Sequence, residues 1–541
     1  MKKQLLISAI FCVSEVCALE FGSMGNTSAS MGGAGVALKS SAWGLYYNPA
    51  LLAADPRVKI GYSLGIGFKE HNLAEITKID ISNMSNVAER LIETFTDTSG
   101  ANAGEIKNVV TSALDSVLKA SSQTPTGDVT KDLETYLQNK QGSSDYSDLA
   151  KEVMNAVQSS SALTPEQKSL LDNIAGSIDY GNLNFDSAKN NALQNITIKK
   201  GGDNGLDKAV GDISTLQEIL KDNNLSVVSQ NGVILQISSK TINQKLGSLG
   251  VAYFGSLYSN LSFKADPERM RLIVNGGGGY YELTDNGDNY SYKESTKDDY
   301  EKFSLIASLE GDSDAHKLVT TSFVLSEIPV GYARTFYLKY GNLNLGVSGK
   351  LMNGISTQHI IAINKGTDFE KELKDLASLD NAISSNNFGI DLGVLYELDL
   401  PKYRYLTVGL VAKNLNSPTF KSTFYDITIK PQYRMGLGYN SKFLKLAFDA
   451  DLVPNDMIAF SNIKQQSQMI GGGVGFDIRA FDLRFGAMKD LKQDTGLILT
   501  AGINLLGFLD IALQSSTKVT DVDGIPIPKY LNLRVGGSFS F

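Results

Sequence analysis

The residue types that most often carry chemistry in proteins are sparse in this chain and are not grouped. Its three histidines, His71, His316 and His359, fall in separate segments without the spacing of a metal site. Asp285 and Asp288 could hold calcium only loosely, because their spacing misses the twelve-residue calcium loop, and an ordinary solvated loop is the simpler interpretation. No Ser/His/Asp set is visible. The sequence therefore predicts no catalytic centre, no metal site and no cofactor.

A glycine-rich segment near the N-terminus resembles a phosphate-binding loop at first sight. It contains Gly32, Gly33 and Gly35, but it lacks the lysine of a GxxxxGK[ST] motif and begins no predicted helix. Nucleotide binding is thereby excluded. Small residues at this density suit instead a backbone that threads a confined space. The formal net charge of -8 also argues against nucleic acid as a partner.

Charged residues recur at alternate positions of candidate strands, which places them on the inner face of a barrel whose outer face is apolar. Because both signs are present, the lumen has no single-charge selectivity. These residues form either a salt-bridged interior around a central segment, which we favour, or the path of a substrate. The set comprises Lys59, Asp391, Arg434, Arg484 and Arg534.

The first 18 residues have the features of an export signal. Two lysines are followed by an apolar stretch from Leu5 to Val13 and by small residues that end at Ala18. Both cysteines, Cys12 and Cys17, lie in this segment, so the mature chain has no thiol chemistry. Lipidation of Cys17 is the alternative, but Glu15 and Val16 do not form the small apolar run that would precede a lipidated cysteine.

Alternation of apolar and polar residues with period two dominates the rest of the chain and indicates β-strands. It is complete from Val58 to Phe68 and recurs from Leu531 to the end. A soluble sandwich also alternates, but these segments are about ten residues long, as a tilted membrane span requires. Beyond the signal there is no apolar run of ~18 residues for a membrane helix. Further examples are 343–351, 388–400, 433–439, 444–452, 470–478 and 481–487. We predict an all-β transmembrane barrel of about 14 to 16 antiparallel strands.

Two stretches break this pattern and predict helices. The larger, 71–225, contains amphipathic segments at 106–120, 148–157, 170–178 and 213–220, and the shorter covers 368–381. The predicted domains are a signal peptide at 1–18, a plug at 19–57, a first strand at 58–70, a helical extracellular insertion at 71–225, and the remaining barrel at 226–541. Short connections near 399–404, 440–442, 480 and 507 alternate with long ones, which predicts a periplasmic C-terminus. Strand ends between Asn260 and Ser326 are not evident from the pattern.

The glycine-rich segment leads into Tyr46-Tyr47-Asn48-Pro49-Ala50. This arrangement resembles the FadL-like superfamily of outer-membrane transporters for hydrophobic compounds, and it is most similar to the TraF-like branch from conjugal transfer operons. The resemblance implies that Gly32, Gly33, Gly35, Asn48, Pro49 and Ala50 belong to a plug, or hatch, inside the barrel. It also implies that the terminal Phe541 is a signal to the barrel assembly machinery. It covers the barrel but not the insertion.

Two functions remain open from the sequence. The resemblance implies a channel that passes hydrophobic small molecules across the bacterial outer membrane. The alternative is a structural or partner-binding protein of conjugal transfer or envelope assembly, with residues 71–225 as the surface for a protein partner. Outer-membrane lipid and the assembly machinery are expected partners in either case. An enzyme is not expected, because no catalytic set is visible.

Overall fold

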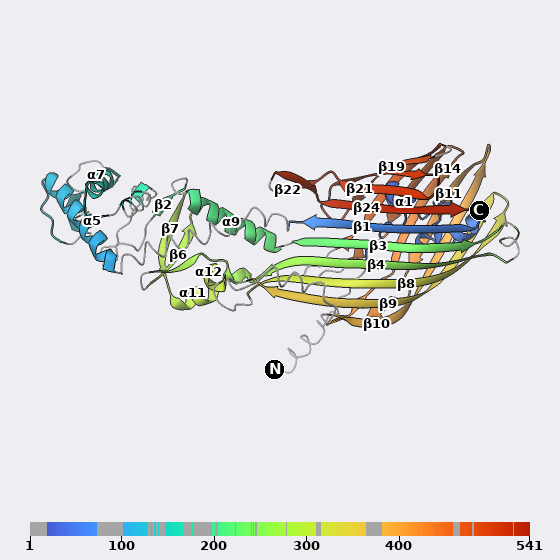
Figure 1. The fold of residues 1–541 in the computed structure, drawn as a ribbon, viewed down its shortest axis with the longest axis horizontal. Helices are drawn as coiled ribbons and strands as arrows, with labels where there is room; N and C mark the ends of the chain where they lie inside the picture. The colour runs from blue at the N-terminus through green and yellow to red at the C-terminus, as the bar shows by residue number, and fades with distance from the viewer. Residues whose placement is uncertain are drawn as a thin grey trace, which may run out of the picture.

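The computed structural model describes residues 19–72, 101–127, 147–163, 197–200, 204–221, 223–363 and 381–541, with short gaps in the longer ranges and a few further residues between 131 and 176. The predicted signal, 1–18, and the predicted helix at 368–381, except for its last position, lie outside the described residues. Figure 1 shows an elongated molecule, with a barrel at one end and the helices α5 (Ala101–Ala120) and α7 (Ser147–Gln158) at the other.

A closed antiparallel barrel of 14 strands forms the body of the protein, which confirms the predicted fold class and strand number. Its strands are β1 (Lys59–His71), β3 (Asn224–Ile237), β4 (Ser248–Ala265), β8 (His316–Leu338), β9 (Gly341–Ala362), β10 (Ile383–Leu400), β11 (Arg404–Lys413), β14 (Gln432–Asn440), β15 (Leu444–Asp451), β18 (Met469–Ile478), β19 (Phe481–Asp490), β20 (Leu497–Leu505), β21 (Leu509–Ser516) and β24 (Tyr530–Ser540). Their order around the barrel is β1-β24-β21-β20-β19-β18-β15-β14-β11-β10-β9-β8-β4-β3.

Strand β1 shows why the sequence forms this wall. Tyr62 and Leu64 point outward and are 39% and 62% exposed, whereas the intervening Ser63 is fully buried in the lumen. The outward residues meet lipid in a membrane, and the inward residues meet the polar interior. β1 closes the barrel by pairing with β24, and the amide of Phe541 donates a hydrogen bond of 2.9 Å to the Val58 carbonyl.

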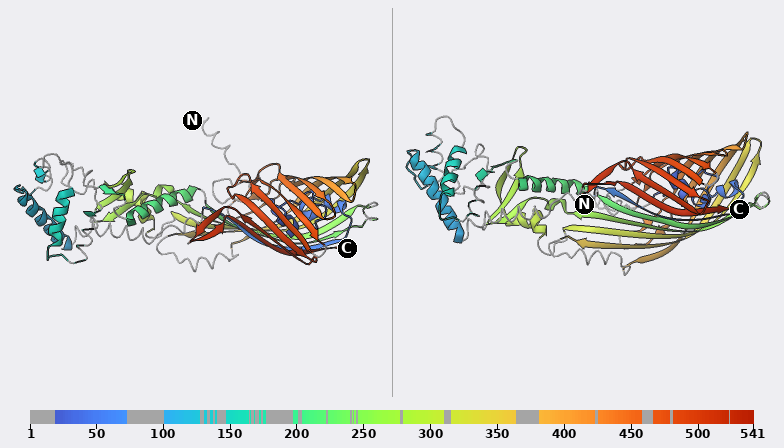
Figure 2. Two further views of the ribbon diagram at one scale, coloured as in Figure 1. Left: turned by 90° about the horizontal axis from the view of Figure 1, so that it is seen from above. Right: turned by 45° about the horizontal axis from the view of Figure 1, so that its top comes forward.

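Strand length differs strongly between the two sides of the barrel. β8 and β9 have 23 and 22 residues, whereas β15 and β21 have 8 each. The prediction of strands about ten residues long is therefore wrong for β8 and β9. These strands continue beyond the barrel because β4 and β8 stay paired as far as Ala265 and His316, where they carry further structure (Figure 2).

We call that further structure the outer domain. It consists of β2 (Thr197–Lys199), α9 (Asn204–Lys221), η2 (Pro267–Arg269), β5 (Ile273–Gly276), β6 (Gly279–Asp285), β7 (Asn289–Ser295), α11 (Lys297–Phe303) and α12 (Leu305–Leu309). Its sheet has the order β2-β7-β6-β5. Ile213 of α9 packs in one core with Val274 and Leu283 of the sheet and Leu305 of α12.

The outer domain corrects two expectations. The insertion at 71–225 is not wholly helical, because β2 pairs with β7 from the connection between β4 and β8. The unclear strand ends between Asn260 and Ser326 belong to this second sheet and not to the barrel. The segments predicted as helices at 106–120, 148–157 and 213–220 lie in α5, α7 and α9, and most of 170–178 lies outside the described residues. None of the described helices is long and apolar enough to cross a membrane.

The two ends of the barrel differ in their connections. At the short-turn end, β8–β9, β10–β11 and β14–β15 are joined by two or three residues, as the hairpin registers show. The long-loop end carries the outer domain and three small hairpins. These are β12 (Thr419–Phe420) with β13 (Ile427–Thr428), β16 (Asn455–Asp456) with β17 (Gln466–Ser467), and β22 (Val519–Val522) with β23 (Ile525–Pro528).

Candidate functional site: the plugged lumen

Residues 19–57 lie inside the barrel and form the plug. They contain three helices of one turn, α1 (Asn26–Ser30), α2 (Gly44–Tyr47) and α3 (Leu51–Ala54), joined by extended and turn segments. Almost every residue from 24 to 55 is buried. So short a segment buries no core of its own, and its apolar residues pack against the barrel wall instead.

Glycines on both sides allow the plug backbone to approach the wall. A Cβ atom at Gly32, which has a φ of +67°, would lie 2.5 Å from the carbonyl oxygens of Gly472 and Ala487. A Cβ atom at Gly35 would lie 2.5 Å from the ring of Tyr47. The structure therefore places these two plug glycines where no side chain fits, whereas Gly33 has more room but a φ of +76°.

Asn48 ties the plug to itself and to the wall. Its Nδ2 donates to the carbonyls of Val36 and Val394, each at 3.1 Å, and its Oδ1 accepts from the amide of Ala50 at 3.0 Å. Pro49 and Ala50 lie against Gly346, where a Cβ atom would be 2.3 Å from the Ala50 nitrogen. The Asn48-Pro49-Ala50 motif thus connects the plug to the barrel wall.

We expect Asn48→Ala to loosen the plug, because it removes the three hydrogen bonds of this side chain, each of which contributes about 0.5–1.5 kcal/mol. The change should raise the hydrogen-exchange rate of amides 36–50 at least tenfold in the refolded barrel. Asn353→Ala, which removes exposed side-chain hydrogen bonds on β9, is the matched control. Unchanged exchange in Asn48→Ala would show that the motif does not hold the plug.

Polar side chains of the wall satisfy the remaining plug backbone. The Asp449 carboxylate accepts from the amides of Gly35 and Val36 at 2.8 and 3.0 Å. Gln514 donates to the Ala29 carbonyl at 2.8 Å, and Gln236 donates to the carbonyls of Leu52 and Asp55. The sequence analysis did not single out Asp449, Gln514 or Gln236, although each lies at an inward position of an alternating strand.

Four of the five predicted luminal residues form ion pairs. Arg434 pairs with Asp451 at 2.6 Å, Lys59 with Asp55 at 3.0 Å, and Lys350 with Asp391 at 3.2 Å. Arg484 pairs with Asp510. The structure distributes these pairs around the wall and does not gather them into one centre.

Arg534 and Lys413 differ from this pattern. Arg534 donates to the Ser63 hydroxyl at 3.2 Å and to the Gln230 carbonyl at 2.5 Å. The Lys413 ammonium lies 3.7 Å from the ring centre of Tyr46 and 4.5 Å from that of Phe21. Among the described residues, neither cation forms an ion pair with a carboxylate. Lys413 was missed by the sequence analysis, although it lies at an inward position of β11, in phase with Thr407.

The Asp55 carboxylate at the end of the plug is held in its charged form. Burial would raise the pKa of this group, but hydrogen bonds and the positive charges of Arg57 and Lys59 lower it to about 2. Lys59 also donates to the carbonyls of Lys39 and Ser41, both at 3.1 Å. The junction of plug and β1 is therefore held by the ion pairs of Asp55 as well as by the covalent connection.

The inner surface of the barrel has an apolar side, formed by β3, β4, β8 and β9. Near the plug, Ile234 and Phe254 pack with Trp43 and Tyr46. Toward the long-loop end, a second cluster contains Leu19, Phe323, Leu325, Met352, Phe420, Ile427 and Ile429. The opposite wall presents Gly472, Asp449 and Gln514, and polar groups such as Gln236 of β3 and Lys350 of β9 also lie on the apolar side.

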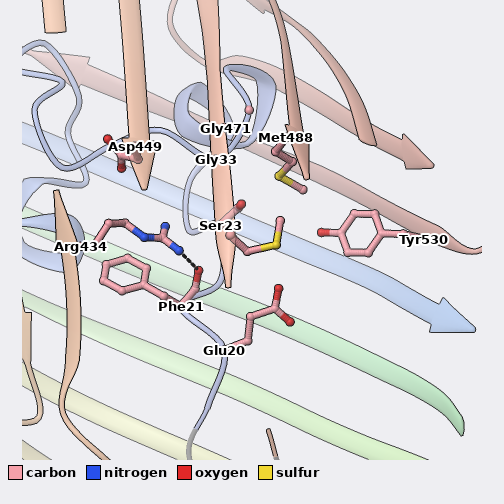
Figure 3. Close-up of a pocket in the computed structure, with 11 residues that line it drawn as sticks. Glu20, Phe21, Ser23, Gly33, Arg434, Asp449, Gly471, Met488 and Tyr530 are labelled. Carbon is pink, nitrogen blue, oxygen red and sulfur yellow. Dashed lines mark hydrogen bonds between the residues drawn. The ribbon is translucent and has the colours of Figure 1, made fainter. Parts of the chain in front are cut away.

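A small cavity of about 20 Å³ lies between the plug and the polar wall (Figure 3). Arg434 points across it and donates to the Phe21 carbonyl at 3.2 Å. Asp449, Met488 and Tyr530 line its other sides. A neighbouring cavity of about 40 Å³ shares Glu20 and Tyr530 with the first and reaches Arg534. Both cavities have mixed polar and apolar linings.

The candidate metal ligands are not brought together. No group of three or more His, Cys, Asp or Glu residues among the described residues is arranged to hold a metal. Asp285 lies at the end of β6 and pairs with Lys200 at 2.8 Å, so its surroundings are those of a hairpin turn. His316 contacts the Ser308 hydroxyl at 2.6 Å.

A family model described as "F plasmid transfer operon, TraF, protein" matches residues 166–451. The match begins inside the insertion and ends at the last residue of β15, so it includes part of the segment that the sequence analysis left outside the resemblance. The plug lies outside the match. No curated protein sequence matches the chain.

Solved structures with similar chains include a mutant of the TodX monoaromatic hydrocarbon channel, with 9% identity, 96% of this chain and 98% of that chain covered, and a TM-score of 0.38. The toluene transporter TodX of Pseudomonas putida has 8% identity, 97% and 98% coverage and a TM-score of 0.30. A mutant porin of Rh. blastica has 10% identity, 59% and 92% coverage and a TM-score of 0.21. These scores are too low to carry an argument about function. The family match covers more than half of the 541 residues, and the chain therefore belongs to the TraF family of the F plasmid transfer operon.

Proposed function

We propose that this outer-membrane barrel is a gated channel for small apolar molecules, which pass along the apolar side of the lumen when the plug moves. The observation that supports the proposal is the line of inward-facing apolar residues on β3, β4, β8 and β9. Inward positions of a barrel are usually polar. Phe254, Phe323 and Leu325 at such positions are best explained by contact with an apolar plug or an apolar solute.

The apolar side extends along the barrel. Phe420 of the β12–β13 hairpin packs on Phe323, with ring centres 5.6 Å apart. Leu19 belongs to the same cluster, and Phe21 two residues later belongs to the cluster around Trp43. A solute that replaces these plug residues would therefore meet one apolar surface near the long-loop end and another at the plug helices, with the Glu327–Lys350 ion pair between them.

Movement of the plug is required, because the plug now fills this side of the lumen. Most contacts that resist movement are hydrogen bonds between plug and wall, each of modest net strength, and water can replace them one at a time. We place the long-loop end and the outer domain outside the cell, since long connections of bacterial barrels are extracellular.

Uptake of toluene by lipid vesicles that contain the mature protein tests the proposal, with glycerol as the polar probe. Leu325→Asn puts an amide on the apolar side and should lower toluene permeation about tenfold, since desolvating an amide costs about 1–3 kcal/mol. Leu506→Asn, the same change at an exposed short turn, should have no effect. Equal toluene uptake in Leu325→Asn and the unaltered protein would contradict the channel proposal.

A second candidate function is that of a partner-binding protein in conjugal transfer, and the outer domain favours it. Two distant chain segments build this domain, and Asn223 joins it to the barrel by donating to the carbonyls of Ile219 and Phe263. A firm platform of this kind suits the display of α5 and α7 to a partner. Replacing residues 101–163 with a Gly/Ser linker should lower conjugation frequency at least tenfold and leave toluene permeation unchanged. An unchanged frequency would exclude this role for α5 and α7.

A further inference from the structure

Three turns at the short-turn end share one dipeptide pattern, a lysine followed by an aromatic residue. They are Lys339-Tyr340 between β8 and β9, Lys402-Tyr403 between β10 and β11, and Lys442-Phe443 between β14 and β15. Because β8, β9, β10, β11, β14 and β15 are neighbours in this order, the three turns follow one another along a single arc of the rim (Figure 1).

We call these three lysine–aromatic pairs the basic arc. All six of their side chains are directed to solvent. Tyr403 is 95% exposed, and Tyr340 and Phe443 are 71% and 64% exposed. The Lys339 and Lys442 ammonium groups lie 5.1 and 5.5 Å from the ring centres of their aromatic neighbours. None of the three lysines forms an ion pair with any residue that the structure describes, and the nearby Arg334 on β8 is also exposed and unpaired.

The backbone of the middle turn is strained. Lys402 and Tyr403 have φ values of +65° and +56°, a region that suits glycine and asparagine and disfavours residues with larger side chains. An Asn-Gly pair would relieve the strain. A lysine and a tyrosine held in this conformation point to a use for their side chains, since strain of this kind collects at functional positions.

The lipid-facing surface below the arc is apolar. Phe336 on β8, Val347 on β9, Val394 on β10 and Leu406 on β11 are all well exposed on the outer face of the barrel. A lipid whose acyl chains cover these residues would place its headgroup beside the lysines. Aromatic side chains lie at headgroup level in membrane proteins, and lysines near a membrane surface attract anionic lipid.

We propose that the basic arc binds anionic phospholipid headgroups in the membrane leaflet that meets the short turns. The phosphate groups of neighbouring lipids accept hydrogen bonds from Lys339, Lys402 and Lys442, and the aromatic rings occupy the interface between headgroup and acyl chain. The turn between β20 and β21 differs, because Leu506-Gly507-Phe508 offers apolar contact without a cation.

The test uses the mature full-length protein in bilayers of phosphatidylethanolamine with a minor fraction of phosphatidylglycerol. Native mass spectrometry of protein extracted with lipid counts the phosphatidylglycerol molecules that remain bound. The triple variant Lys339→Gln, Lys402→Gln, Lys442→Gln should lose the preference for phosphatidylglycerol by about tenfold or more, since each lysine near the surface contributes about fivefold. Replacing the same lysines with arginine should preserve it.

Two further variants make the result decisive. The triple variant Lys119→Gln, Lys297→Gln, Lys302→Gln makes the same charge change at exposed positions away from the rim, and it should leave the preference for phosphatidylglycerol intact. Lys402→Asn with Tyr403→Gly should raise the urea midpoint of unfolding while lowering phosphatidylglycerol retention, because it relieves strain and removes a lipid contact. Equal retention in the glutamine triple variant and the unaltered protein would overturn the proposal. Neither result depends on whether the barrel conducts apolar solutes.

Discussion

Gly393→Val is expected to release the plug from the wall and to raise the permeability of the refolded barrel at least tenfold. A Cβ atom at this position would lie 2.0 Å from Oδ1 of Asn48 and 2.9 Å from Cδ of Pro49. Overpacking a well-filled interior costs about 1–3 kcal/mol even where side chains can adjust, and here the conflicting group is the connector of the plug. The strand itself should tolerate valine, which favours β-structure.

Single-channel conductance measures the opening, and the one tryptophan of the chain, Trp43, reports the position of the plug. Trp43 is 3% exposed, so its emission should shift to longer wavelength when the plug leaves the wall. Gly349→Val is the matched control, because a Cβ atom there meets nothing within 4 Å. A closed barrel with unshifted emission in Gly393→Val would mean that the plug can repack around the new side chain.

Arg434→Ala is expected to destabilise the folded barrel by about 3–5 kcal/mol, the usual cost of leaving one member of a buried ion pair without its partner. Arg434 and Asp451 are almost fully buried and 2.6 Å apart. The substitution also removes the donor to the Phe21 carbonyl and the guanidinium 3.9 Å from the Phe21 ring. Urea unfolding followed by Trp43 fluorescence gives the change.

The double variant Arg434→Ala with Asp451→Ala separates the pair from the general loss of packing. Without the stranded carboxylate, it should be more stable than Arg434→Ala alone, with a coupling energy of about 1 kcal/mol or more. If the two substitutions are simply additive, the pair contributes nothing beyond its separate contacts. In that case the plug is held by the backbone hydrogen bonds of Asp449 and Asn48 instead.

Part of the luminal site follows from the strand pattern, and part does not. The alternation marks Arg434 as inward-facing, and its partner Asp451 lies directly opposite across the β14–β15 hairpin. The partner of Arg484 could not be found in this way, because Asp510 is two strands away on β21. The apolar side was missed because Phe254 and Phe323 flank the region where the pattern changes from barrel to outer domain.

The sequence by itself determines that the chain forms a barrel, because period-two alternation gives each strand a lipid-facing and a luminal face. It also determines that a segment of small residues precedes the first strand. Only the tertiary structure decides which luminal groups meet, since closure of the barrel brings residues hundreds of positions apart into contact, as with Asn48 and Val394. The same holds for the outer sheet, where Lys199 pairs with Asn289. Such pairings depend on where distant segments of the chain lie relative to each other in the folded protein, and local periodicity carries no information about those positions.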